Sequence, residues 1–283
     1  MAKQSVQRLI RPSTTKFHTK LKSFNTVTKG AVATLEVDKG YTYEAIMLSM
    51  TNNGSACAKA DFIALIDNIQ LVIDGKTRWD LSGSDYINIL AHKGVSVFNG
   101  VLPLCFLMDD MRTTQGADFT GLGTADLKTV TLKVKINASA VNPTLEARGI
   151  VSPNSNVGFI PTYETLNLSA SAVGKMDYND ISTSPSLIRC LHAYTSNIDE
   201  VAVKYNKVDV VEEIPTAELK HRDESFFRQG RAWQTGVTHI DFMPSARFDD
   251  ALAGNGGSLQ LKLNMTATGA FNMVVERVEQ GVK

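Results

Sequence analysis

The stretch Val130-Thr131-Leu132-Lys133-Val134-Lys135-Ile136 alternates apolar with polar residues at every position. Successive side chains of an extended strand point to opposite faces, so this pattern predicts a strand with one buried and one solvated face. The stretch LQLKLNM, residues 259–265, repeats the pattern. Strands of parallel sheets covered on both sides are continuously apolar instead, so the alternation favours the antiparallel sheets of a sandwich or barrel.

Further strand-like segments follow along the chain and are separated by turn signals such as Asn53-Gly54 and Asp74-Gly75. Two short stretches have helical spacing, and we expect Ser84 and Thr216 to cap them. The sequence therefore predicts an all-β fold with short helical insertions. The further strands are expected over residues 31–37, 43–50, 69–73, 95–98, 187–194, 201–205 and 271–278.

The order of these segments indicates an internal duplication. A strand-like segment, a turn and a helical turn follow one another at residues 70–73 and again at residues 202–205. Each set is followed by one of the two alternating stretches, and each stretch is expected to begin a closing hairpin. Two tandem eight-stranded β-sandwiches explain this order better than one large sheet. We place a basic N-terminal arm at residues 1–30, the first sandwich at 31–152 and the second at 153–283; the resemblance described below implies that both are jelly rolls.

The charges are unevenly distributed along the chain. The 29 Lys and Arg residues balance the 29 Asp and Glu residues, yet residues 1–35 contain seven basic residues and no acid. Apolar residues alternate with these cations, which would suit anionic headgroups at a membrane interface, although a solvated tail and nucleic-acid binding are alternatives. We expect no specific nucleic-acid recognition, because aromatic stacking groups are few. The candidate arm contacts are Lys3, Arg8, Arg11, Lys16, Lys20 and Lys22.

Several function classes are disfavoured. No apolar run approaches the roughly 18–20 residues of a membrane-spanning helix, and no secretory signal is evident. Cys57, Cys105 and Cys190 are few and far apart, so buried free thiols in a reducing compartment are expected.

The residues that bear chemistry form no recognisable catalytic pattern. The five histidines lie in no metal-ligand spacing, and the glycine-rich segments precede strands rather than helices. We therefore predict that the chain is not an enzyme and has no cofactor. The adjacent carboxylates of Asp109 and Asp110 could bind Ca²⁺, although solvated loop carboxylates are the plainer interpretation.

Four stretches in this order resemble a known family: residues 43–46, YEAI; 72–76, VIDGK; 238–243, THIDFM; and 275–277, VER. The chain resembles the double jelly-roll major capsid proteins of tailless icosahedral phages with an internal membrane, of the corticovirus type. The resemblance runs discontinuously from about residue 22 to the C-terminus. The basic extension and the loops differ from the family pattern, so arm contacts and metal sites are not transferred.

The resemblance implies a structural virion protein that forms pseudo-hexameric homotrimers. These would contact neighbouring capsomers, a penton or vertex protein and, through the arm, an internal lipid membrane or its proteins. Assembly would take place in the cytoplasm of a host bacterium. The alternative is a carbohydrate-binding or adhesive jelly-roll module, which would need exposed aromatic platforms; Trp79 and Trp233 are the only tryptophans. A β-sandwich hydrolase ranks third.

Overall fold

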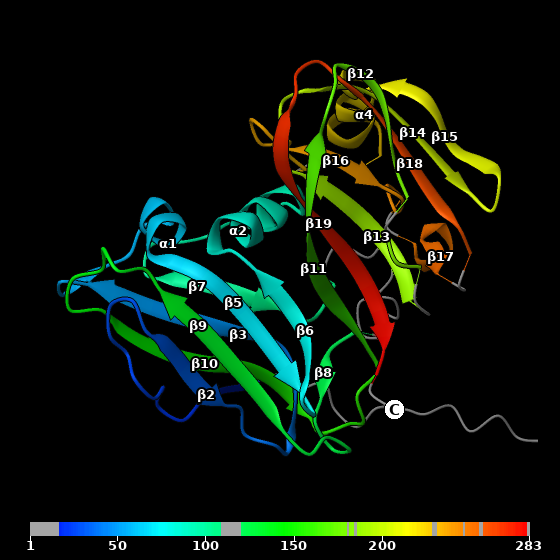
Figure 1. The fold of residues 1–283 in the computed structure, drawn as a ribbon. Helices are drawn as coiled ribbons and strands as arrows, with labels where there is room; N and C mark the ends of the chain where they lie inside the picture. The colour runs from blue at the N-terminus through cyan, green and yellow to red at the C-terminus, as the bar shows by residue number, and fades with distance from the viewer. Residues whose placement is uncertain are drawn as a thin grey trace, which may run out of the picture.

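The computed structural model describes residues 17–108, 120–179, 181–183, 186–227, 231–245, 247–254 and 257–281. These residues form two β-sandwiches that lie side by side, the first drawn in blue to green and the second in green to red (Figure 1). Short helices interrupt the strands. The predicted all-β fold with helical insertions is confirmed.

The first sandwich packs two sheets against each other. One sheet has the strand order β1-β10-β3, with β4, β7 and β8 also paired to β3, and the opposite sheet has the order β2-β9-β5-β6. The strands are β1 Phe17–Lys20, β2 Val32–Glu36, β3 Tyr41–Asn52, β4 Ser55–Ala56, β5 Ile66–Ile73, β6 Lys76–Leu81, β7 Val101–Cys105, β8 Leu122–Gly123, β9 Val130–Ile136 and β10 Thr144–Pro153.

The second sandwich repeats this arrangement, except that the short strand β4 has no counterpart. The order β11-β19-β13-β16, with β17 also paired to β13, matches the first sheet, and β12-β18-β14-β15 matches the second. Both units are therefore jelly rolls of one topology, as the duplication in the sequence predicts. The strands are β11 Phe159–Ala170, β12 Gly174–Tyr178, β13 Ser186–Ala193, β14 Ile198–Tyr205, β15 Val208–Pro215, β16 Thr238–Asp241, β17 Leu252–Gly254, β18 Leu259–Met265 and β19 Gly269–Gln280.

One helical connection occupies an equivalent place in the two rolls, namely α2, Gly83–His92, in the first and α4, Thr216–His221, in the second. In the first roll α1 spans Lys59–Leu65, and α2 connects β6 to β7. In the second roll α4 and a π-helix, Arg222–Phe227, connect β15 to β16, and a short 3₁₀ helix spans Phe248–Asp250. None of the helices in the described part of the chain is long and apolar enough to cross a membrane.

The local signals locate turns and helix ends to within a few residues. Ser82, rather than Ser84, caps α2 by accepting a hydrogen bond from the backbone amide of Asp85 at 3.0 Å. The predicted Asp74-Gly75 turn connects β5 to β6, and both residues have the positive φ that such a tight hairpin requires. The prediction of a strand at residues 95–98 is wrong. This segment follows the end of α2 at His92, and residues 95–97 form no strand.

The expected closing hairpins are also wrong. β9 pairs with β2 and β5, whereas β10 pairs with β1 and β3, so the last two strands of the first roll lie in opposite sheets. β18 and β19 are separated in the same way. Two alternating strands joined by a short connection can either pair as a hairpin or lie in opposite sheets. The sequence pattern is the same in both cases, because the inner face of each sheet needs an apolar residue at every second position.

The first roll begins within the predicted arm, so the boundary at residue 30 needs correction. β1 pairs antiparallel with β10 from Phe17 opposite Val151 to Lys20 opposite Arg148. Leu21 is buried in the core of the first roll. Residues 17–21 are thus part of the roll, where β1 supplies its first strand and covers the edge of β10.

Each roll has an apolar core between its sheets. In the first core Leu132 and Val134 of β9 are fully buried together with Ile46 and Leu48 of β3. In the second, Leu261 of β18 is equally buried. Burial of such side chains contributes about 1.5–3 kcal/mol each, so these cores are the main source of stability.

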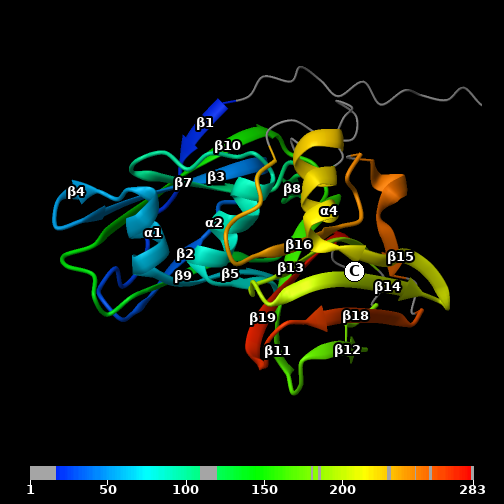
Figure 2. The same ribbon diagram turned by 90° about the horizontal axis from the view of Figure 1, so that it is seen from above.

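The two rolls share one sheet. β6 of the first roll pairs in parallel with β11 of the second through Trp79 opposite Tyr163 and Asp80 opposite Glu164. This contact joins four strands of the first roll to five of the second in a continuous nine-stranded sheet. Seen from above, α2 lies where the two rolls meet (Figure 2).

Candidate functional site

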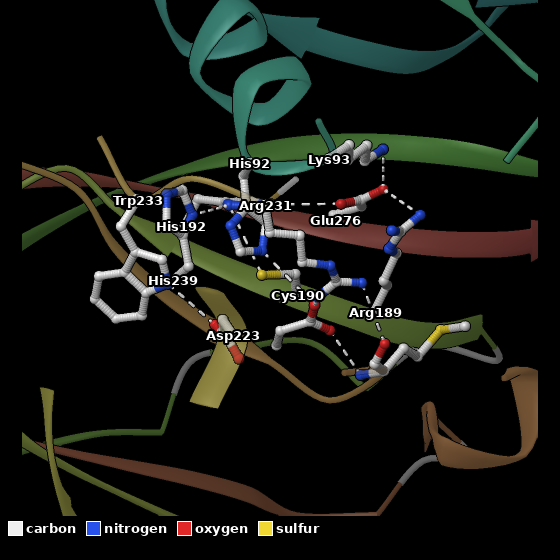
Figure 3. Close-up of polar contacts among 12 residues, drawn as sticks. His92, Lys93, Arg189, Cys190, His192, Asp223, Arg231, Trp233, His239 and Glu276 are labelled. Atoms are coloured by element: carbon white, nitrogen blue, oxygen red, sulfur yellow. Dashed lines mark hydrogen bonds and ion pairs between the residues drawn. The ribbon is translucent and has the colours of Figure 1, made fainter. Parts of the chain in front are cut away.

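The end of α2 places two polar side chains of the first roll against the second roll. Tyr86 and Leu90 of α2 are buried in the first core, which fixes the helix along that face. His92 lies in the last turn and Lys93 follows it, so both side chains extend to β13, β16 and β19 (Figure 3). We call the polar cluster formed there the junction.

The strands of the second roll present a polar face to α2. β13 and β16 pair with His192 opposite His239 and Cys190 opposite Asp241. Residues two apart on a strand share a face, so the four side chains lie together. Cys190 is also opposite Glu276 of β19. All five are at most 3% exposed, although four of them are polar or charged.

Glu276 is the first centre of charge in the junction. A β-bulge between Ile188 and Cys190 re-aims Arg189, whose Nη1 lies 3.6 Å from Glu276 Oε1. Lys93 Nζ of the first roll lies 2.5 Å from the same oxygen. Burial raises the pKa of Glu276, but the cations of Arg189 and Lys93 outweigh it and leave the pKa well below its usual value. The ionised carboxylate therefore bridges the two rolls.

Asp241 is the second centre of charge. Its carboxylate forms a buried ion pair with Arg231 and accepts a hydrogen bond from the amide of Met243 at 2.7 Å. His92 Nε2 of the first roll lies 3.6 Å from Asp241 Oδ2. Burial raises the pKa of Asp241, yet Arg231 and His92 more than offset this and keep the pKa far below its usual value.

Three histidines fill the space between these carboxylates. Burial lowers the pKa of His92 to about 4, although Asp241 opposes the shift. Burial also lowers the pKa of His192 and His239, and the neighbouring His92 lowers that of His239 further. The Nδ1 atoms of His192 and His239 lie 2.6 Å apart, so one ring donates and the other accepts. The rings are neutral near pH 7.

A second polar layer lies behind the histidines. Asp223 Oδ2 accepts a hydrogen bond from Trp233 Nε1 at 3.1 Å, and Asp223 Oδ1 accepts one from Arg222 Nε at 3.0 Å. Burial raises the pKa of Asp223 to about 6, and the charge of Arg222 opposes this shift. Arg222 also donates to the backbone oxygen of Asp241 at 3.1 Å, which connects this layer to the junction.

Further hydrogen bonds cross between the rolls beside the junction. Trp79 Nε1 donates to the backbone oxygen of Pro161 at 2.7 Å, and Lys93 Nζ donates to the hydroxyl of Tyr163 at 3.0 Å. Tyr194 donates its hydroxyl to the backbone oxygen of Asp85 at 2.9 Å. Together with the shared sheet, these bonds fix one orientation of the second roll on the first.

The junction is not arranged for catalysis, although it contains a thiol and imidazoles. Cys190 Sγ lies 3.7 Å from His192 Nδ1, a pairing that could activate a nucleophile. However, burial raises the pKa of Cys190 well above its usual value, and the residue is only 1% exposed. A protonated thiol without access to substrate is not a nucleophile, so the polar groups serve to join the rolls.

The structure separates the predicted arm residues into two groups. Lys20 and Lys22 lie on the first roll, where they face Glu146 at 3.8 Å and Asp38 at 2.8 Å. They are exposed side chains of the roll and its flank, not members of a separate arm. The other predicted site residues lie outside the described residues: Lys3, Arg8, Arg11, Lys16, Asp109 and Asp110.

Sequence reasoning missed the junction. Its histidines come from α2, β13 and β16, and the sequence places His92 a hundred residues before His192. No local spacing brings them together, and only the fold does so. The available signal was the presence of two polar side chains, Arg189 and His192, within a largely apolar strand, which is unusual for a core strand.

Comparison with solved structures shows the same double fold in three viral proteins. The major capsid protein P2 from bacteriophage PM2 matches with a TM-score of 0.84 and 19% identity, over 95% of this chain and 99% of that one. A chain of Sulfolobus turreted icosahedral virus matches with a TM-score of 0.66 and 11% identity, over 93% and 90%. The PBCV-1 virus capsid matches with a TM-score of 0.64 and 9% identity, over 98% and 99%.

Comparison with protein families is more specific than these structural likenesses. Residues 18–152 match the viral coat protein P2 N-terminal domain, and residues 160–281 match the viral coat protein P2 C-terminal domain. No curated protein sequence matches the chain significantly. The two family domains coincide with the two jelly rolls and together cover most of the chain. The chain therefore belongs to the viral coat protein P2 family.

Proposed function

We propose that this chain is a major capsid protein whose homotrimers, pseudo-hexagonal in outline, tile an icosahedral shell around an internal membrane. The observation that supports this most is the junction, which holds two rolls of one topology in a fixed side-by-side arrangement. Three such chains present six similar wedges around a threefold axis, and six wedges close a hexagonal tile. The two rolls differ in sequence, which lets them make different contacts with neighbouring capsomers and with a vertex protein.

The oligomeric state tests this proposal directly. Size-exclusion chromatography with light scattering should give a particle of three times the chain mass of 30.8 kDa. A strictly monomeric chain at high concentration would contradict the trimer. Electron micrographs of the assembled protein should show closed shells, which an adhesive module would not form.

The arm is proposed to contact the inner membrane or its proteins. This part of the proposal now rests on Lys3, Arg8, Arg11 and Lys16, because Lys20 and Lys22 are paired with acids of the first roll. Each cation near an anionic bilayer surface contributes about 1 kcal/mol of binding, and salt screens the attraction. Assembly in the host cytoplasm before the chain becomes part of the virion is consistent with the buried free thiols of Cys57 and Cys190.

The membrane contact can be tested with a matched pair of variants of the full chain. Arg8→Ala/Arg11→Ala should weaken co-sedimentation with vesicles that contain phosphatidylserine, whereas Lys20→Ala/Lys22→Ala should leave it nearly unchanged. Neither variant should bind vesicles of phosphatidylcholine alone. Equal binding by both double variants, or binding insensitive to salt, would contradict a role for the arm.

The carbohydrate-binding alternative has lost its main support. Trp79 is completely buried among Tyr86, Phe106 and Tyr163. Trp233 is half-buried and packs its ring edge-to-face against His239. The two tryptophans are therefore not free to form the exposed platforms that sugar binding would require.

A further inference from the structure

We propose that His92, Cys190 and His239 form a binding site for Zn²⁺ that connects the two jelly rolls. One atom of each side chain can serve as a ligand, and these three atoms all lie within 4.8 Å of one another. His92 comes from α2 of the first roll, and the other two come from β13 and β16 of the second (Figure 3). This inference is independent of the capsid proposal.

The donor set selects the ion. Two imidazoles and a thiolate are typical ligands of Zn²⁺, whereas Ca²⁺ and Mg²⁺ prefer oxygen. Zn–N bonds of about 2.0–2.1 Å and Zn–S bonds of about 2.3 Å place ligand atoms roughly 3–4 Å apart, so small side-chain rotations would close the site. Exposure of at most 2% for all three residues would exclude competing water.

The surroundings of His92 point to a missing ligand. Neither ring nitrogen of His92 has a hydrogen-bond partner among the described residues, although both are fully buried. A buried polar group left in this state costs about 1–3 kcal/mol, and native structures rarely keep one without a purpose. A metal ion bound to one nitrogen would leave the other to donate to Asp241, whose Oδ2 lies 3.6 Å from Nε2.

The neighbouring histidines show the orientation expected around a metal. His239 Nε2 lies 3.2 Å from Gln234 Oε1, and His192 Nε2 lies 3.4 Å from Glu276 Oε2. Their Nδ1 atoms face inwards, and Nδ1 of His192 also lies 3.7 Å from Cys190 Sγ. Outer oxygens that hold one ring nitrogen while the other faces the ion are typical of metal sites. His192 therefore lies next to the fourth ligand position of a tetrahedral Zn²⁺ ion bound by the other three side chains.

Charge and protonation are compatible with the ion. Burial lowers the pKa of His92 and His239, so both rings have the neutral form that binds metal. Cys190 would release its proton to solvent on binding, because a metal ion stabilises the thiolate. The positive charges of Lys93, Arg189 and Arg231 oppose a cation, but the ionised Glu276 and Asp241 lie against them and offset two of the three charges, and the thiolate of Cys190 adds a third negative charge.

Metal binding by the unaltered full chain is the first test. Protein stripped by a chelator and dialysed against Zn²⁺ should retain the ion stoichiometrically by elemental analysis. Co²⁺ in place of Zn²⁺ should give a thiolate-to-cobalt charge-transfer band and a tetrahedral spectrum. Free Zn²⁺ at 100-fold above its dissociation constant should raise the thermal midpoint by about 5–10 °C. Absence of retained Zn²⁺ and of the cobalt band would overturn the proposal.

Variants locate the site. Cys190→Ser should abolish the charge-transfer band, and His92→Gln should lower Zn²⁺ retention and the thermal shift. Cys57→Ser is the matched control, since Cys57 is an equally buried free thiol outside the junction, and it should keep both signals. Circular dichroism verifies that each variant is folded. Retention of the cobalt band in Cys190→Ser would place the ion elsewhere and overturn the proposal, as would its loss in Cys57→Ser alone.

Discussion

The roll cores and the junction between the rolls are buried to the same extent but have opposite chemistry. Leu132 and Leu261 lie among other apolar side chains, and each is at most 1% exposed. Glu276 and Arg189 in the junction are at most 2% exposed. Apolar contact is non-directional, whereas ion pairs and hydrogen bonds need fixed distances and angles. The cores therefore stabilise each roll, and the junction specifies how one roll sits on the other.

The largest effect is expected from neutralising a junction carboxylate. Glu276→Gln leaves Lys93 and Arg189 buried without their counter-charge, which should lower the free energy of unfolding by about 3–5 kcal/mol. Urea denaturation followed by fluorescence measures it. The control is Glu213→Gln, because Glu213 forms an exposed pair with Lys175 at 2.5 Å. That variant should unfold like the parent. If the two substitutions lowered the free energy of unfolding equally, the charges of the junction would not be what holds the two rolls together.

A cavity in a core should have a somewhat smaller and different effect. Leu261→Ala removes a fully buried side chain from the second core and should lower the free energy of unfolding by about 2–5 kcal/mol. The folded chain should still form the same oligomer, because the junction is unchanged. Val208→Ala is the control, since Val208 is 65% exposed and its truncation should cost within about 0.5 kcal/mol. Loss of the oligomer in folded Leu261→Ala would remove the distinction between core and junction.

The smallest effect concerns the layer behind the junction. The pKa of Asp223 is raised from 3.8 to about 6, so the folded state binds a proton at higher pH than the unfolded state does. The contribution of Asp223 to the free energy of unfolding therefore decreases as pH rises from about 4 to 6, by at most about 1.4 kcal/mol per pH unit. Asp223→Asn should lack this contribution, which urea denaturation of both proteins at several pH values can measure. If the free energies of unfolding of the two proteins changed with pH in parallel, the raised pKa of Asp223 would be contradicted.

Local signals predicted the strands but not their partners. The alternation in β9 and β18 depends on neighbours in the sequence, so it identified both strands with their exact bounds. β1 is only four residues long, with mixed polarity, and its partner β10 lies more than a hundred residues away. Nothing local therefore distinguished residues 17–20 from the arm that precedes them.

The junction was beyond prediction for a related reason. Lys93 and Glu276 meet only because α2 of one roll is packed against β19 of the other. In the sequence, Lys93 and Glu276 each look like an ordinary surface charge, and each histidine of the junction looks like an isolated histidine. The duplication was visible in the sequence, but the contact between the two copies has no counterpart within either copy and leaves no repeated pattern.

The parallel contact of β6 with β11 has a mechanical consequence. Two residue pairs, Trp79 with Tyr163 and Asp80 with Glu164, connect the sheets of the two rolls through the backbone. In a wall under outward pressure, a load on one roll would pass to the other along this seam as shear across neighbouring strands. The seam is short, so the side chains next to it would determine whether the pair of rolls flexes or behaves as one stiff plate.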